Sequence, residues 1–395
     1  MAVISKLNEN GKDITKYNNA TISNINFNGA DYHFAKPIQV ENGICDDAVA
    51  EPLIDMQISG ESIQDGTPTP DAPIEIESVG DKTKNLFNKT DATMMLKVRV
   101  EADGIIYDNT IQNYQTAIIK VKPNTKYTVN VNVSGYTGQS PVGRNAFYTT
   151  YPTIGVTVGT VNSTIFGSIY PRTVTTPADA QYWAIWVNRS TNINQQVLDS
   201  LIIVEGEYTS ETMPSYEPYG YKIPLKVNDT ITNIYLNKPL RKVGDEADYI
   251  DYKNKKVVRK VGVKTTDFKQ YSYNSQNKYL YLTNKMTSFS DKIFNSFNCI
   301  SNKIATFKSF PGSADSNALM VSGNSFYYFV VAEESEIQTY IDLLAETEIH
   351  YILKQPDDTE TIELSNISTF KGTNIFDIET NVKPSSLQIE YWKQI

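Results

Sequence analysis

Hydrophobic and polar residues alternate along much of the chain with a period of two, which places successive side chains on opposite faces of a β-strand. In residues 126–133, for example, a tyrosine and three valines fall on one face, and a threonine and two asparagines fall on the other. Residues 73–77 and 387–391 alternate in the same way. Turn-forming residues separate such runs about every ten residues, a spacing typical of sandwiches and barrels. The pattern predicts a mainly β fold of half-buried antiparallel strands.

One segment has the periodicity of a helix instead. Its apolar residues recur at i, i+3, i+4 and i+7, at Ile337, Tyr340, Ile341 and Leu344. Ser335 and Gln338 have the spacing of a capping box, in which two side chains satisfy free amide groups at the start of a helix. We therefore predict one short helix near 335–346, closing one end of a β-rich domain.

Proline-rich stretches suggest where domains begin and end. Residues 65–73 contain three prolines, which remove amide donors and fix φ, so this stretch predicts a stiff, extended connector rather than a central strand. Further breaks fall at 213–220 and, more weakly, at 355–358. Between them, 249–252 and 256–259 have the pattern of two hairpin arms around a turn that holds Asn254.

These breaks predict five parts. They are an N-terminal segment (1–55), a proline-bearing connector (56–84), a β-sandwich domain (85–221), a β-hairpin connector (222–260) and a C-terminal β-rich domain with the short helix (261–395). At 395 residues, the chain is long enough for two or three domains of ordinary size. Each large part can therefore have its own hydrophobic core.

Composition and charge narrow the choice of partners. The net charge of −9 and the pI near 5.0 argue against nucleic acid, because such binders need clustered cations. The N-terminus has no apolar stretch of the kind found in signal peptides, and the longest apolar runs, such as 327–332, are too short to cross a membrane. We expect a protein made in a bacterial cytoplasm without a signal peptide and without membrane insertion.

Few residues offer catalytic or metal-binding chemistry. The chain has two histidines, His33 and His350, and two cysteines, Cys45 and Cys299, in no metal-ligand or redox spacing. The common hydrolase, metalloprotease, nucleotide-binding and EF-hand motifs are missing from the sequence. We predict a non-enzyme without cofactor or metal. Cleavage of glycosides by paired carboxylates stays open, because the 45 acidic residues allow many pairs.

An aromatic strand at 181–187 carries the candidate binding residues. Trp183, Ile185 and Val187 share one face, which we expect to be core, whereas Tyr182 and Trp186 share the other. Exposed aromatic rings can stack on the CH groups of a sugar, so Tyr182 and Trp186 are the candidates for saccharide contact. The alternative is that a neighbouring loop or subunit covers Trp186.

Cations gather around the predicted hairpin, at Lys253, Lys255, Lys256, Arg259, Lys260 and Lys264. They are compatible with an anionic partner such as teichoic acid. They are also typical of a solvated hairpin edge, where lysines discourage edge-to-edge aggregation.

Six short phrases of the sequence stand out, at 58–73, 85–87, 214–220, 239–245, 248–252 and 370–376. These phrases resemble tail structural and receptor-binding proteins, of baseplates or tail fibres, from phages and prophages of Gram-positive bacteria. The resemblance implies that the sandwich is a jelly roll similar to carbohydrate-binding modules and that 1–55 attaches the chain to the particle. It also implies a trimer that contacts other tail or baseplate proteins, and it supplies no catalytic residues.

The sequence therefore predicts a structural subunit at the host-facing end of a phage tail or phage-tail-like particle. Contact with host cell-surface glycan through the sandwich is a further expectation, and multivalency would strengthen weak sugar contacts. Two alternatives remain, a tail enzyme that degrades wall or surface polysaccharide and a pure scaffold with no receptor contact.

Overall fold

The protein is described by a computed structural model in which the polypeptide is mainly β, as the alternating pattern predicts. Side chains and backbone are described for most of 57–362, apart from 92–93, 102, 109–114, 133–141, 156–163, 166–168, 189–194, 228–229, 267, 286–298, 309–316 and 323–324. Only the backbone is described at 164–165, 188, 226–227, 230–231, 284–285, 308, 321–322, 325 and 354. Outside that range the structure describes the backbone of the strands at 8–9, 12–13, 20–27, 30–41, 44–47, 51–52, 368–369, 372–379 and 386–393.

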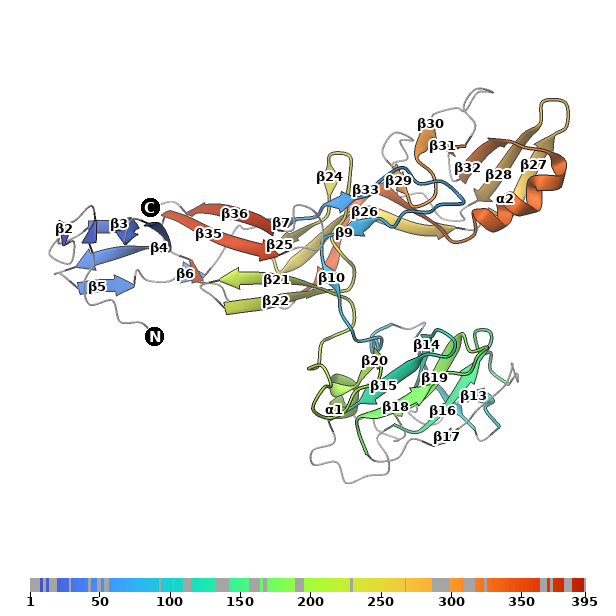
Figure 1. The fold of residues 1–395 in the computed structure, drawn as a ribbon, viewed down its shortest axis with the longest axis horizontal. Coiled ribbons are helices and arrows are strands. Elements are labelled where there is room, and N and C mark those ends of the chain that lie inside the picture. The colour runs from blue at the N-terminus through green and yellow to red at the C-terminus, as the bar shows by residue number, and fades with distance from the viewer. Residues whose placement is uncertain are drawn as a thin grey trace. The chain divides into compact units, whose positions relative to one another are not determined.

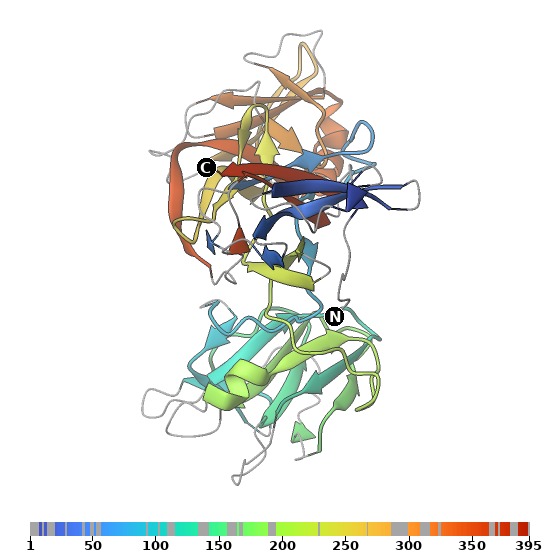
Figure 2. The same ribbon diagram turned by 90° about the vertical axis from the view of Figure 1, so that its left-hand side faces the viewer.

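The chain forms two compact units. The first contains residues 1–81 and 222–395, and the second contains residues 82–221 (Figures 1 and 2). The second unit nearly coincides with the predicted sandwich domain. The segments predicted as connectors, 56–84 and 222–260, instead contribute strands to the first unit, short ones from the first segment and longer ones from the second. The sandwich is thus an insertion into a β framework that is completed by chain on both sides of it.

An antiparallel five-stranded sheet forms the centre of the first unit. Its order is β29 (Cys299–Ser301), β33 (Thr347–Thr361), β26 (Lys256–Thr266), β25 (Tyr249–Asp251) and β7 (Gln57–Ser59). The β25–β26 pair is the predicted hairpin, with Ile250 opposite Val257. Strand β7 comes from before the inserted sandwich and pairs with β25, which comes after it.

A second five-stranded sheet packs with the short helix. Its order is β27 (Gln270–Asn274), β28 (Tyr279–Lys285), β32 (Ser325–Val331), β31 (Ala318–Ser322) and β30 (Thr306–Lys308), with β30 and β31 parallel. Helix α2 (Ile337–Leu343) follows the 3-10 turn η2 (Glu334–Glu336) and lies beside this sheet (Figure 1). The shared core contains Leu280, Leu282, Phe326, Tyr328 and Ile349.

The predicted helix is confirmed, but its cap differs from the prediction. Ile337 and Leu344 are buried in the core and Tyr340 and Ile341 pack against it, as the spacing requires. The backbone amide of Glu333, rather than of Ser335, donates to the carboxylate of Glu336 over 2.7 Å. An extra 3-10 turn before the helix moves the cap two residues earlier, which the helical periodicity does not reveal.

The remaining strands of the first unit form a third five-stranded sheet and several smaller ones. The five-stranded sheet has the order β10, β21, β35 and β36, and β22 also pairs with β21. Strands β3, β4 and β5 form a three-stranded sheet, and four two-stranded pairs complete the described set. Their bounds are β1 (Asn8–Glu9), β2 (Lys12–Asp13), β3 (Ala20–Phe27), β4 (Ala30–Glu41), β5 (Ile44–Asp47), β6 (Glu51–Pro52), β8 (Ser62–Ile63), β9 (Glu77–Ser78), β10 (Asp81–Lys82), β21 (Tyr221–Val227), β22 (Thr230–Leu236), β23 (Lys242–Val243), β24 (Glu246–Ala247), β34 (Ser368–Thr369), β35 (Gly372–Glu379) and β36 (Ser386–Lys393).

The second unit is an antiparallel sandwich with an added hairpin. One sheet has the order β11 (Met95–Leu96), β14 (Gln115–Lys120), β19 (Tyr182–Asn188), β16 (Arg144–Tyr148) and β17 (Thr164–Ile165). The other has the order β18 (Arg172–Thr175), β15 (Lys126–Asn130) and β20 (Ile202–Glu205). A hairpin of β12 (Val98–Val100) and β13 (Ile106–Asp108) and the helix α1 (Gln195–Ser200), visible in Figure 2, complete it. The finer prediction of a jelly-roll topology stays a prediction.

No helix in the described part of the chain is both long and apolar enough to cross a membrane.

Candidate functional site

Strand β19 divides its side chains between two buried layers. Trp183, Ile185 and Val187 are fully buried between the two sheets, which confirms the predicted core face. The Trp183 indole stacks on Phe147, with ring centroids 5.6 Å apart, and its Nε1–H donates to the Asn145 side-chain oxygen over 3.1 Å. This hydrogen bond satisfies the one polar atom of the buried indole.

The opposite face of β19 is partly covered by the β12–β13 hairpin. Ala184, at the centre of this face, is fully buried in a second core beneath Val98 and Val100. The hairpin is held to the sheet by the Thr116 hydroxyl, which donates to the Val98 carbonyl over 2.7 Å. The Tyr148 hydroxyl likewise donates to the carbonyl of Gly104, in the hairpin turn, over 2.6 Å. The hairpin thus adds a third layer to the two sheets of the sandwich.

The two candidate saccharide residues lie on this face, on either side of Ala184. Tyr182 and Trp186 are both half-buried. They are four residues apart on one strand, so their Cα atoms are separated by about 13 Å. That separation is larger than one sugar ring, and the two aromatic residues can contact only different units of an oligosaccharide. Their role in glycan binding stays a prediction.

The structure adds Tyr151 to this surface. Its ring is 44% exposed and meets the Tyr182 ring edge-on, with centroids 5.5 Å apart and planes at 84°. Partial burial, with Asp91 and Tyr182 nearby, raises the pKa of Tyr151 above its usual value of 10.0. Sequence reasoning missed Tyr151 because it follows β16 and reaches Tyr182 only through sheet pairing. Tyr151, supported by the half-buried Tyr182, is therefore the more accessible aromatic ring for a ligand on this surface.

The entry and exit of the sandwich are joined by Asn85, which we call the clasp. Its side-chain nitrogen donates to the carbonyls of Leu201 (3.2 Å) and Glu217 (3.0 Å), and its oxygen accepts from the amides of Phe87 and Ile203 (both 3.0 Å). Asn85 and Glu217 belong to two of the phrases on which the resemblance rests. Their function in the fold is to close the inserted sandwich.

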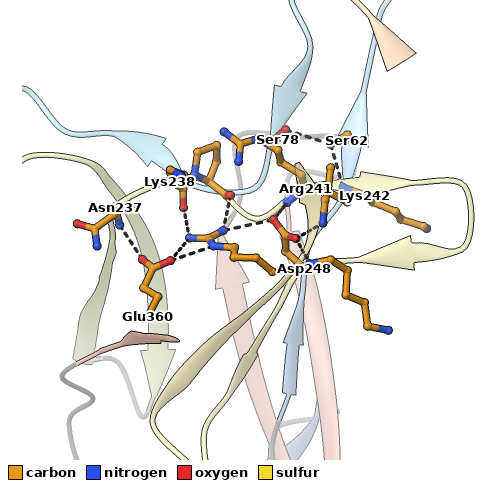
Figure 3. Close-up of polar contacts among 12 residues, drawn as sticks. Ser62, Ser78, Asn237, Lys238, Arg241, Lys242, Asp248 and Glu360 are labelled. Carbon is orange, nitrogen blue, oxygen red and sulfur yellow. Dashed lines mark hydrogen bonds and ion pairs between the residues drawn. The ribbon is translucent and has the colours of Figure 1, made fainter. Parts of the chain in front are cut away.

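A second set of phrases meets at a buried ionic cluster in the first unit, which we call the joint and which is drawn in Figure 3. At its centre is Arg259, whose side chain is 8% exposed. Four of its N–H groups donate, to Glu360 (2.9 Å), Asp248 (3.3 Å), and the carbonyls of Pro239 (2.7 Å) and Lys238 (2.8 Å), and its Nη2 also lies 2.8 Å from the Glu360 carboxylate. A guanidinium has five donors, so nearly all the donors of this buried cation have acceptors.

Asp248 completes the joint and has no exposed side-chain surface. Its Oδ1 accepts from the amides of Lys260 (2.7 Å) and Val261 (2.9 Å), and its Oδ2 accepts from the amide of Arg241 (3.1 Å). The β26–β33 pairing is irregular around Arg259, and such an irregularity leaves backbone groups without partners in the ladder. Asp248 therefore supplies the acceptors that the irregular ladder lacks.

The joint also ties the strands before the sandwich to those after it. The amide of Gly60 donates to the Asp248 carbonyl over 2.7 Å, and a Cβ at Gly60 would lie 2.7 Å from backbone atoms of Leu240 and Arg241. The Ser62 hydroxyl accepts from the amide of Lys242 over 3.0 Å (Figure 3). Only glycine permits this close approach, so the phrase that contains Gly60 has a steric reason for its composition.

Three of the six cations predicted around the hairpin are paired with carboxylates in the structure. Arg259 belongs to the joint and is not part of a surface patch. Lys256 pairs with Asp358 over 3.0 Å, and Lys260 pairs with Glu246 over 2.8 Å while lying over the Tyr249 ring. Because three of the six cations already face carboxylates, the hairpin is a weaker site for an anionic polymer than its sequence suggests.

The titratable residues named from the sequence do not assemble into a catalytic or metal site within the described part of the chain. His350 is buried, and its Nε2 lies 2.6 Å from Glu348, whose carboxylate pKa is lowered chiefly by that hydrogen bond. Cys299 lies on β29, where burial raises its pKa to about 12. No group of three or more potential ligands is found among the described residues. His33 and Cys45 lie on β4 and β5, whose side chains are outside the described set.

No protein-family model, curated protein or solved structure matches the chain.

Proposed function

We propose that this chain is a structural subunit at the host-facing end of a phage tail or phage-tail-like particle, where it presents its sandwich to the host surface. The observation that carries the proposal is that a compact sandwich, residues 82–221, is inserted into a β framework formed by the chain on both sides of it. The phrases that resemble tail proteins supply the clasp at Asn85, which closes the inserted sandwich, and Asp248 of the joint, which ties together the strands of the framework on either side of the insertion. A subunit that displays a binding module needs this arrangement.

The outer surface of the sandwich is the proposed glycan contact. An exposed aromatic ring offers stacking to the CH face of a sugar, and Tyr151 with Tyr182 supplies such a ring, with Trp186 farther along the same strand. A single contact of this kind is weak. Assembly into a trimer, together with many subunits on one particle, would raise the avidity by increasing the effective concentration.

Localisation in the particle tests the structural role. An antibody against the purified chain should label one end of particles from the producing strain in negative-stain electron microscopy. Light scattering of the purified chain should give the mass of a trimer. Particles that lack the label, although the chain is expressed, would contradict the proposed role.

Cell attachment tests the aromatic surface. The Tyr151→Ala and Trp186→Ala variants should reduce binding of correctly assembled particles to host cells roughly tenfold, within the range for loss of one stacking ring. Tyr271→Ala is the matched control, because Tyr271 is 54% exposed in the first unit. Unchanged attachment of both sandwich variants would contradict the glycan contact and favour the alternative of a pure scaffold.

A separate experiment tests the enzyme alternative. Shortened chains of host wall polysaccharide after incubation with the purified protein would support an enzyme that degrades it.

A further inference from the structure

A cavity of about 400 Å³ lies in the first unit, and none of its lining residues belongs to the sandwich. It is lined by the proline-bearing loop that follows β8, by the chain between β29 and β30, and by helix α2. Pro68, Pro70 and Asp71 line it from the loop, Tyr340 from the helix, and Asn317 from the start of β31. Its volume falls within the range of small-molecule sites.

The loop that lines the cavity is fixed in place. The Gln64 side-chain nitrogen donates to the carbonyls of Ile74 and Ser301, both over 3.0 Å, so it joins the two ends of the loop to β29. The amide of Ile74 donates to the Asn302 carbonyl over 2.8 Å, and Thr69 and Ala72 exchange backbone hydrogen bonds. The segment predicted as an extended connector is therefore a folded loop, and the cavity is formed before any ligand binds.

Three polar groups around the cavity have unused hydrogen-bonding capacity. Asp71 and Asn317 are exposed at the cavity and Tyr340 is half-buried. Within the described residues, the carboxylate of Asp71, the hydroxyl of Tyr340 and the side-chain nitrogen of Asn317 have no protein partner, and the Asn317 oxygen accepts from Tyr328 over 2.8 Å. Asp71 also contributes to the raised pKa of both Tyr340 and Tyr328, after the larger effect of burial. Asp71 and Tyr340 line the same cavity, from the loop and from helix α2.

The charged and polar groups that line the cavity indicate which class of ligand it can bind. A divalent cation needs several oxygen ligands with more negative charge than the single carboxylate of Asp71. An anion would meet that carboxylate, while the ammonium of Lys303 already donates to the carbonyls of Leu343 (2.8 Å) and Ala345 (2.5 Å). An apolar ligand would bury Asp71 and Tyr340 without partners, which is costly. A neutral molecule with several hydroxyl groups meets all three conditions.

We propose that this cavity binds a neutral sugar residue, with Asp71 accepting from its hydroxyls, Asn317 donating to them, and the rings of Pro68, Pro70 and Tyr340 contacting its CH face. The site deepens the proposed function, because it gives the framework its own contact with host glycan. It rests on that function only for the biological source of the sugar. Binding of free sugars by the purified chain does not depend on a particle.

Saturation-transfer NMR on the full-length chain with free hexoses and N-acetylhexosamines at millimolar concentration tests the site. We expect transfer to at least one neutral sugar. Asp71→Ala should weaken its binding roughly tenfold or more, and Tyr340→Phe, which keeps the ring, should weaken it several-fold, as loss of a charged and a neutral hydrogen bond implies. Asp65→Ala is the matched control, because Asp65 is an exposed acid in the same loop but outside the cavity lining.

Two results would overturn the cavity site. One is no transfer to any sugar of the panel. The other is equal binding by the wild-type chain and the Asp71→Ala and Tyr340→Phe variants, with loss only in Tyr151→Ala, which would place the sugar on the sandwich. Unchanged unfolding curves of the variants exclude a folding defect. A chain that binds sugar at this cavity but is absent from particles would refute the proposed function and leave the cavity site standing.

Discussion

The joint of the first unit and the core of the second both centre on buried side chains, yet different interactions hold them together. Around Trp183 the sandwich buries aromatic and aliphatic side chains with a single polar link, to Asn145. Around Arg259 the framework buries a cation with two carboxylates and several backbone groups. Apolar packing is non-directional and tolerates related side chains. A buried ionic cluster needs every partner, so it fixes one geometry.

The largest effect should come from removing the acid of the joint. Asp248→Ala leaves Arg259 without one of its charged partners and leaves the amides of Arg241, Lys260 and Val261 without an acceptor. Breaking a buried pair costs about 3–5 kcal/mol. Hydrogen exchange measured by mass spectrometry should show lost protection in peptides of β26 and β33, while peptides of β19 keep theirs.

Two further variants sharpen this prediction. Asp251→Ala is the control, since Asp251 caps only the hairpin turn, where hydrogen bonds from Asn254 lower the pKa of its carboxylate. The double variant Asp248→Leu with Arg259→Met removes both charges and should recover only part of the loss, because the three backbone amides stay unpaired. Equal protection of β26 in the wild-type and Asp248→Ala chains would show that the joint does not hold the framework.

The reverse pattern should follow from a change in the sandwich. Trp183→Ala empties the centre of the core and leaves the Asn145 side chain without its donor, at a cost of about 3–5 kcal/mol. Trp183→Phe keeps most of the packing and should cost less, as expected for a related apolar side chain. In the same exchange experiment, peptides of β14, β16 and β19 should lose protection while β26 keeps it. Simultaneous loss in both units would contradict their independence.

Local patterns in the sequence were sufficient for the elements with regular periodicity. Trp183, Ile185 and Val187 could be assigned to the core because a strand alternates its side chains, and Ile337 and Leu344 could be assigned to a helix face because their spacing fits one. The β25–β26 hairpin follows from two short arms around a turn. In each case the residues that interact are close in the sequence.

The joint and the cavity could not be predicted, because their residues come together only in the folded chain. Arg259 and Glu360 are 101 positions apart, and in the sequence Arg259 looks like one more cation among the hairpin lysines. Similarly, Asp71 and Tyr340 share a cavity although one lies in a proline-rich stretch that resembles a linker. The glycine at position 60 was a usable signal, since the close approach to Leu240 and Arg241 excludes any larger residue.

The smallest effect concerns the pH dependence of the framework. The hydrogen bond from His350 lowers the pKa of the Glu348 carboxylate below its ordinary value of 4.5. A carboxylate with a lowered folded pKa contributes stability above its unfolded pKa, and that contribution is lost as the pH falls through the folded pKa. The first unit should therefore lose stability below pH 4.5, and Glu348→Gln should reduce the loss. Urea midpoints near neutrality and in acid measure the difference, which should be well below the effect of Asp248→Ala because Glu348 is 40% exposed. Identical acid curves for Glu348→Gln and the wild-type chain would show that the framework's acid sensitivity comes from other carboxylates.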